Sequence, residues 1–239
     1  MAPPATLPIE PGRDCPRCPR LVAYREANRA AHPDWHNAPV LSFGSLDARL
    51  LIVGLAPGLK GANRSGRPFT GDYAGDLLFA TLVKFGFATG QYRAPREDGP
   101  WTGDSLRLTD ARIANAVRCL PPQNKPLPAE ITTCRPFLAS EIAAMGRLRA
   151  LIALGRVAHD SVLAAVELRP SRYKFAHGAV HVLPSGVLLA DSYHCSRYNT
   201  NTGRLTPAMY EAVFADLHRR LRSSGDASAK PTGAIPSLA

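Results

Sequence analysis

Two unbroken apolar runs constrain the fold of this chain more than any other feature. Residues 49–55 and 149–154 are apolar at every position after the first. Strands that expose one face to water alternate apolar and polar side chains, whereas strands buried on both faces of a parallel sheet form continuous apolar runs. Because parallel strands are joined by long crossovers, usually helices, the runs predict an α/β fold, a mostly parallel sheet with helices on both of its sides.

The remaining segments alternate between strand and helix patterns, as such a fold requires. Further strands are predicted at residues 112–119, 179–183 and 187–191. Helices are predicted at residues 75–85, 129–146, 156–168 and 207–221. The last helix carries its apolar residues on one stripe, which is the pattern of a helix that packs against a sheet.

The two ends of the chain differ from its middle in composition. Residues 1–14 are Pro-rich, and residues 223–239 are rich in Ser, Ala, Gly and Pro. Such segments bury too little apolar surface to fold alone, so we expect a flexible arm, one domain over residues 15–222 and a disordered tail. The sequence has no stretch of 18 apolar residues and no secretory pattern at its start, which predicts a cytoplasmic protein without membrane contact, expected to be a monomer.

The charge of the chain indicates the kind of partner. Lys and Arg number 29 against 19 Asp and Glu, for a formal net charge of +10. A surplus of this size favours an acidic partner, nucleic acid before an anionic membrane. A codon composition that enriches Ala, Arg and Pro is the alternative explanation.

Three long loops follow the predicted strands, at residues 54–72, 115–122 and 194–206. They are rich in small, Gly or polar residues, and ordinary connections in α/β folds need two to six residues. In parallel sheets, ligands bind beyond the carboxyl ends of the strands. We therefore expect the functional site where these loops meet.

The first of these loops is rich in glycine, which permits close backbone approach to a ligand. It matches neither the Walker A motif nor the dinucleotide-binding motif G-x-G-x-x-G, so a hydrolase of nucleotide phosphates is a weak alternative. Phe69 is the only aromatic residue in the loop. It either plugs the loop onto the core or stacks on a planar base.

The cysteines indicate a metal site. Cys15 and Cys18 form a C-x2-C pair, and Cys119 and Cys134 lie far downstream. Four thiolates suit tetrahedral zinc or a [4Fe-4S] cluster. Because a hundred residues separate the two pairs, such a site would staple the N-terminal segment to the domain. Four unrelated buried thiols are the alternative interpretation.

Taken in order, these motifs resemble the uracil-DNA glycosylases of the iron–sulfur branch, and most of all family 5, also called type B. The resemblance covers residues 15–206. The matching segments are CPRC at 15–18, GLAPGLKGANRSGRPFTGD at 54–72, NAVRCLPP at 115–122 with the later Cys134, and HCSRYNTNTGRLT at 194–206.

The resemblance implies a fold, a cofactor and an activity. The fold is a single-domain three-layer α/β/α sandwich, with the N-terminal segment stapled by a structural [4Fe-4S] cluster. The activity is hydrolysis of the N-glycosidic bond of uracil in DNA, and of hypoxanthine or other damaged bases as in the family, leaving an abasic site. It also implies a DNA repair protein of bacterial or archaeal type, associated with the nucleoid. No Lys occupies a matched catalytic position, which predicts a monofunctional enzyme.

Excision of a base from a duplex requires that it be flipped into a pocket and leave as an anion. His194 is predicted to donate a hydrogen bond to the departing base, and Asn115 to read its edge through amide donor and acceptor. Phe69 would form the stacking floor. The predicted pocket wall and its backbone donors are Gly54, Leu55, Ala56, Pro57 and Gly58. A strand-capping His and a turn Asn are the alternative interpretations.

Many relatives in the superfamily carry an acidic or amide side chain in the first motif, where it handles the attacking water. This chain has Leu55-Ala56-Pro57 there, as family 5 members do, and Asp72 is the candidate substitute. From the sequence, Asp72 is equally well explained as the cap of the helix predicted at residues 75–85.

Contacts to DNA phosphates are predicted on two of the loops. The candidates are Ser196, Arg197, Tyr198 and Asn199 on the third loop, and Lys60, Arg64 and Arg67 on the first. Arg197 or Tyr198 is also a candidate wedge for the gap left by a flipped base. A solvated turn into the last helix is the alternative for the third loop, and a zinc-stapled nucleic-acid-binding module without catalysis is the alternative for the whole chain.

Overall fold

The computed structural model describes residues 7–95 and 101–226. Its centre is a six-stranded sheet in the order β1-β5-β2-β6-β8-β7. The inner strands β5, β2, β6 and β8 are parallel, and the edge strands β1 and β7 are antiparallel to their neighbours. The strand bounds are Phe43–Gly44 (β1), Leu50–Gly54 (β2), Ala111–Asn115 (β5), Ala150–Leu154 (β6), Val180–Val182 (β7) and Leu188–Ser192 (β8).

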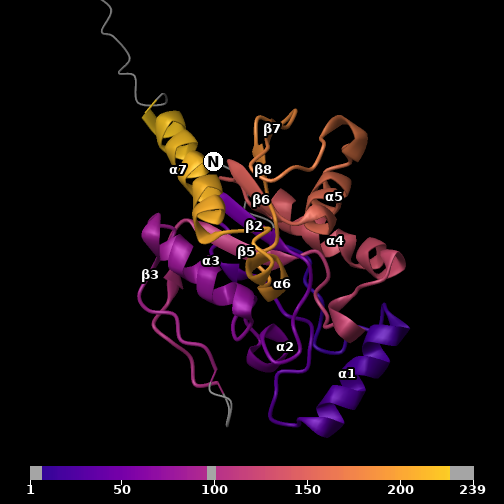
Figure 1. The fold of residues 1–239 in the computed structure, drawn as a ribbon. Helices are drawn as coiled ribbons and strands as arrows, with labels where there is room; N and C mark the ends of the chain where they lie inside the picture. The colour runs from indigo at the N-terminus through magenta and orange to yellow at the C-terminus, as the bar shows by residue number, and fades with distance from the viewer. Residues whose placement is uncertain (1–6, 96–100, 227–239) are drawn as a thin grey trace, which may run out of the picture.

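Helices cover both faces of this sheet (Figure 1). On one face, Leu50 and Ile52 pack with α3 (Tyr73–Lys84) and α7 (Pro207–Asp226). On the other, Leu51 and Val53 pack with α4 (Pro128–Ala144) and α5 (Arg156–Ala165). Alternate residues of β2 thus reach opposite cores, which is why the run is apolar throughout. The predicted three-layer α/β/α fold is confirmed.

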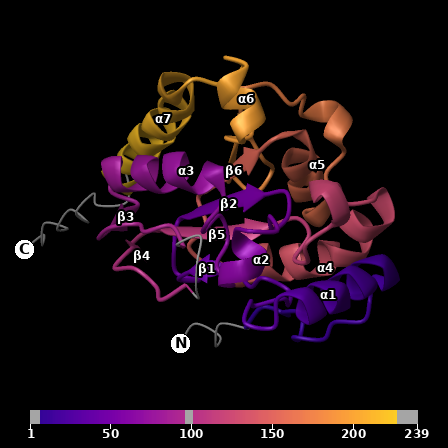
Figure 2. The same cartoon turned by 60° about the horizontal axis from the view of Figure 1, so that its bottom comes forward.

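The N-terminal part contains a helix that the apolar pattern did not predict, α1 (Pro19–Ala31). Figure 2 shows it beside α4 at one end of the molecule. Helix α1 is joined to α4 by a bidentate ion pair between Arg20 and Glu130, with both nitrogen–oxygen distances at 2.8 Å. The helix buries Leu21 but also the polar Arg25 and Asn28. A face of this kind produces no apolar stripe in the sequence.

Several predicted bounds differ from those of the structure. The strand predicted at residues 112–119 ends at Asn115, where its neighbour β2 also ends, although Ala116 N–H still donates to the Gly54 carbonyl. Helix α7 continues to Asp226, four residues into the predicted tail. The Ser223 hydroxyl there donates to the carbonyls of Arg219 and Arg220, one turn back. Residues 227–239 of that tail lie outside the described part.

The predicted N-terminal arm is described from residue 7 onward. Ile9 N–H donates to the Ser140 hydroxyl at 2.7 Å, and Pro11 is buried. The described part of the arm therefore contacts helix α4 through Ile9. Within residues 7–95 and 101–226, no helix is long and apolar enough to span a bilayer.

Short elements complete the described part. They are α2 (Ala62–Ser65), α6 (Arg197–Asn201), the hairpin of β3 (Ala88–Thr89) and β4 (Arg107–Leu108), and the 3-10 turns Pro122–Asn124 and Pro170–Arg172. Of these, α2, α6 and the first 3-10 turn lie in or next to the three loops that follow strands β2, β5 and β8.

Candidate active site

The three long loops meet at one pocket of about 500 Å³ beyond the carboxyl ends of the parallel strands. The predicted site residues that line it are Leu55, Ala56, Gly58, Phe69, Asp72, Asn115, His194, Ser196, Arg197 and Tyr198. Gly54 and Pro57 lie behind the wall and do not line it. Segments more than a hundred residues apart thus supply one cavity, as the strand-end argument predicts.

Phe69 and His194 face each other in this pocket. Their ring centroids lie 6.1 Å apart, with 22° between the ring planes. Phe69 has a positive φ of 60°, an uncommon conformation for a bulky residue that clusters at ligand sites. An added Cβ at Gly54 would overlap both the Phe69 ring and the Asn115 amide. Glycine is required at position 54 so that these two side chains can share the space next to the strand end.

Asn115 and His194 both present polar groups that have no hydrogen-bond partner in the described part of the chain. Asn115 ends β5 and is 3% exposed. Among the described residues, neither its amide group nor the His194 ring makes a hydrogen bond. Burial lowers the pKa of His194 to about 4, so its imidazole is neutral at pH 7 and offers one N–H donor. Both side chains are therefore available to a ligand.

Asp72 does not cap helix α3, although it occupies the N-cap position. Its side chain makes no capping hydrogen bond; the carboxylate turns to the glycine-rich loop, where it accepts from Ala62 N–H at 3.4 Å. An added Cβ at Gly58 or Gly61 would overlap it. Burial raises the pKa of Asp72 to about 6, against the lowering effect of backbone hydrogen bonds from Ala62 and Gly58. The glycine-rich loop therefore surrounds a carboxylate that belongs to the protein itself, that of Asp72.

The mouth of the pocket is formed by helix α6 and its surroundings. Tyr198 is 73% exposed there, and the Arg197 guanidinium lies 5.2 Å from the centroid of the Tyr73 ring. Asn199 does not line the pocket; its amide donates to the His194 carbonyl at 2.8 Å, which fixes the backbone that carries the imidazole. Asn199, one of the predicted phosphate contacts, thus holds the backbone of His194 in place.

Sequence reasoning missed three residues that line the pocket, Tyr73, Ala74 and Asn124. Tyr73 follows Asp72 directly, and its aromatic side chain next to a candidate catalytic residue was an available signal. Asn124 belongs to the turn Pro122–Asn124, in which both Gln123 and Asn124 have positive φ. That turn places Asn124 in the pocket lining and is not visible in a pattern of apolar residues.

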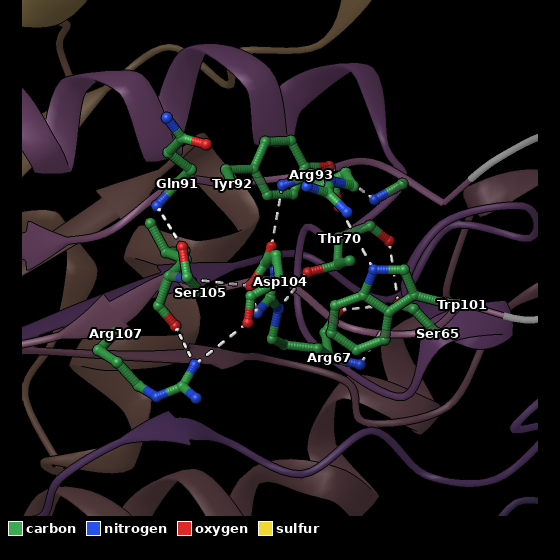
Figure 3. A network of polar contacts seen from close by, with 12 residues as sticks. Ser65, Arg67, Thr70, Gln91, Tyr92, Arg93, Trp101, Asp104, Ser105 and Arg107 are labelled. Carbon is green, nitrogen blue, oxygen red and sulfur yellow. Dashed lines mark hydrogen bonds and ion pairs between the residues drawn. The ribbon is translucent and has the colours of Figure 1, made fainter.

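Arg67 does not fit the prediction of a phosphate contact. Its guanidinium forms a bidentate ion pair with Asp104, at 2.8 and 2.5 Å, and Nε donates to the Thr70 hydroxyl (Figure 3). The Trp101 ring packs against the same group, with its centroid 4.5 Å from the guanidinium carbon. Arg67 is thus buried, and its charge is matched by a carboxylate from the segment that joins β3 and β4.

The other two basic candidates lie outside the pocket lining. Lys60 is exposed on the same loop, and the Arg64 guanidinium lies 5.6 Å from the Trp35 ring centroid.

The four cysteines predicted as metal ligands surround a second, small cavity of about 20 Å³. They come from the segment before α1, the loop after β5 and helix α4, and none forms a disulfide. Burial raises the pKa of Cys119 to about 12, and the neighbouring Cys134 adds to the shift. Cationic Arg25, 6% exposed, also lines the cavity. Burial also raises the pKa of the Cys18 and Cys134 thiols. Four converging cysteines, beside a cation that can balance the negative charge of thiolates, form a donor set suited to a metal centre.

Residues 41–218 match the family model described as the Uracil DNA glycosylase superfamily. The chain belongs to this superfamily, as its motifs indicated. It is 44% identical over 211 residues to a type-5 uracil-DNA glycosylase of Thermus thermophilus, covering 86% of this chain and 93% of that protein. It is 43% identical to the type-5 enzyme of Mycobacterium leprae (86% and 90% covered). Similarity to a type-4 uracil-DNA glycosylase of Pyrobaculum aerophilum is lower, 31% over 152 residues, covering 63% of this chain and 60% of that protein.

Proposed function

We propose that this protein hydrolyses the N-glycosidic bond of uracil in DNA and leaves an abasic site, as a monofunctional DNA repair glycosylase. The type-5 relatives are named uracil-DNA glycosylases, and the similarity extends over 93% and 90% of their lengths. The observation that carries the proposal is the pocket itself, in which Phe69, Asp72, Asn115 and His194 meet from three loops. An aromatic face, a free amide, a neutral imidazole and a carboxylate are the groups that this reaction requires.

Uracil enters this pocket after it is flipped from the helix. Phe69 supplies a flat apolar face for the ring. The Asn115 amide carries a donor and an acceptor, which complement the N3–H and O4 edge of uracil. Because the amide is buried and has no partner among the described residues, it remains unpaired when a base lacks this edge, and such a mismatch is costly.

The base departs with negative charge, and the sugar becomes a cation. The imidazole of His194 is already neutral, so its protonation state does not have to change. Its N–H donates a hydrogen bond to the base oxygen on which negative charge develops. Asp72, ionised at neutral pH because its pKa is about 6, stabilises the cationic sugar and orients the attacking water. Both groups are preorganised, His194 by the Asn199 bond to its backbone and Asp72 by the glycine cradle.

The alternative in which the glycine-rich loop binds a nucleotide phosphate is disfavoured by the same cradle. The carboxylate of Asp72 already occupies the space beside Gly58 and Gly61. A phosphate there would face a like charge in a buried setting.

Cys15, Cys18, Cys119 and Cys134 are proposed to hold a [4Fe-4S] cluster. Four sulfurs around one zinc ion lie about 3.8 Å apart, given a zinc–sulfur bond of about 2.3 Å. All four cysteines are described, yet no three of their sulfurs lie within 4.8 Å of one another, which favours the larger cluster. When bound, the cluster supplies structural cross-linking of the N-terminal segment to the loop after β5 and to α4. It lies outside the catalytic pocket.

DNA is proposed to bind across the pocket mouth. Tyr198 and Tyr73 are exposed aromatic side chains there, Arg197 is an exposed cation, and the net charge of the chain is +10. Exposed aromatic groups suit the gap left by a flipped base, and arginine suits the flanking phosphates.

The activity is tested with a duplex that contains one uracil, followed by alkali to cleave abasic sites. Strand cleavage is expected with uracil and not with thymine at the same position. Retention of this activity in excess chelator would exclude a metal-dependent phosphate hydrolase. Tight DNA binding without any cleavage would favour the non-catalytic binding module instead.

A further inference from the structure

A second cluster of titratable side chains lies away from the pocket and the cysteines. His159 of α5, His181 of β7 and Asp191 of β8 meet on the sheet face that α5 covers. Each offers one ligand atom, and these atoms all lie within 4.8 Å of one another. His159 and Asp191 are fully buried, and His181 is 20% exposed. None of the three lines the catalytic pocket.

Two polar atoms of this cluster are buried and find no hydrogen-bond partner within residues 7–95 and 101–226. They are Asp191 Oδ2 and His181 Nε2, which point at each other across 3.6 Å. Native proteins rarely leave such atoms unpaired, and where they do, a bound ion or water often satisfies them. An unpaired oxygen of a buried carboxylate is especially costly because it carries charge.

His159 has the orientation of a metal-bound histidine. Its Nε2 lies 2.8 Å from the Tyr173 carbonyl, to which it donates, and its Nδ1 faces Asp191 Oδ1 at 2.7 Å. Histidines that bind metals typically donate their second ring nitrogen to a backbone carbonyl in this way. The rings of His159 and His181 lie 5.9 Å apart at 64°, so their nitrogens converge on the carboxylate from two directions.

We propose that His159 Nδ1, His181 Nε2 and the Asp191 carboxylate bind one Zn²⁺ ion, with water at the fourth position. Imidazole and carboxylate are ligands that zinc accepts in tetrahedral sites. Without the ion, a proton on His159 Nδ1 bridges to Asp191, and zinc binding releases that proton. Of the three ligands His181 alone is partly exposed, so the ion would enter beside it.

Such an ion would fasten α5 and β7 to β8. Asp191 precedes His194 by three residues, so the site would stabilise the strand that delivers the pocket imidazole. The expected role is structural, and the inference does not depend on the proposed function.

The test equilibrates the full-length protein with excess Zn²⁺, removes unbound ion, and measures zinc and iron per chain by mass spectrometry. We expect about one zinc in the wild type, none in His181→Ala or Asp191→Asn, and one in the matched control His177→Ala, which alters a histidine of the same segment outside the cluster. Unchanged iron in each sample separates zinc at this site from zinc that replaces the cluster. Equal zinc in wild type and His181→Ala would overturn the proposal.

A second readout covers the case in which Asp191→Asn fails to fold. An ion that binds only the folded state raises the melting temperature, by roughly 5 °C or more when its concentration is 100 times Kd. We expect this shift on Zn²⁺ addition in wild type and His177→Ala and not in His181→Ala, whose substituted side chain is partly exposed. A wild type that shows no shift and no bound zinc would refute the site.

Discussion

The carboxylate of Asp72 occupies the space in which a side chain on Gly61 would have to lie. Gly61 and the candidate catalytic residue Asp72, eleven residues apart, thus depend on each other for space. The fit explains why the loop after β2 is rich in glycine although it lacks a nucleotide-binding motif. It also makes the position of the carboxylate testable without changing Asp72.

Gly61→Ala is expected to slow uracil excision by at least about 10-fold, because the new methyl group displaces a preorganised charge. Binding of uracil-containing DNA should change little. Gly146→Ala is the matched control, since a Cβ there meets nothing within 4 Å. Single-turnover rates of the two variants check the prediction, and a Gly61→Ala enzyme with the wild-type rate would contradict it.

Asp72→Asn is expected to lower the rate and raise the stability. Burial raises the pKa of Asp72 from 3.8 to about 6, so folding takes up a proton between those values and the carboxylate destabilises the fold at higher pH. Removing it should stabilise the protein by up to about 3 kcal/mol at pH 7.5. The gain should vanish as pH falls to 3.8, which thermal unfolding at several pH values measures.

The same pKa predicts how excision depends on pH. The ionised carboxylate is the active form, so the rate should rise through about pH 6 and level off above it. His194, with a pKa of about 4, adds no inflection above pH 5. In Asp72→Asn the rise near pH 6 should be absent. If it persists, another group handles the water.

Cys119→Ala is expected to lose bound iron and brown colour and to become poorly soluble, because a cluster ligand is removed. Cys195→Ala is the matched control. Cys195 is buried, and its thiol lies in the core against Tyr210, at 3.6 Å from the hydroxyl, and does not line the cysteine cavity. Iron content and visible absorbance distinguish the two. Iron retained by Cys119→Ala would remove it from the ligand set.

Substitutions at Arg197 and at the partner of Arg67 should differ in their effect on the salt dependence of DNA affinity. Arg197→Ala is expected to reduce the slope of log affinity against log salt by about 1. Asp104→Asn, which breaks the buried pair with Arg67, should destabilise the protein by roughly 3 kcal/mol but leave that slope unchanged. A slope reduced by about 1 in Arg67→Gln would instead show that Arg67 contacts DNA phosphates.

The parts of the fold that the sequence predicted are those in which burial dictates composition. Strands β2 and β6 lie between two helical layers, so their apolar runs are compatible with one kind of fold. Helix α1 was missed because it buries Arg25 and Asn28 along with Leu21. Helix α6 was missed because a five-residue helix has no periodicity to detect.

The sequence predicted which residues form the candidate site but not which contacts they make. Loops after parallel strands must meet at one edge of a sheet, which brought His194 and Asn115 together. The partners of Arg67 and Asp72 depend on how the loop folds back: Asp104 lies 37 residues from Arg67, and the direction of the Asp72 side chain is set by the glycine cradle. Such pairings leave no spacing signature in one sequence.

The central claim is that the base leaves as an anion whose charge His194 stabilises. Fluorine at C5 of uracil already stabilises that anion, so 5-fluorouracil needs less help to leave. We predict that His194→Ala slows single-turnover excision of uracil on the order of 10²-fold or more and slows excision of 5-fluorouracil much less. An equal loss on both bases, or no loss on either, would contradict the account.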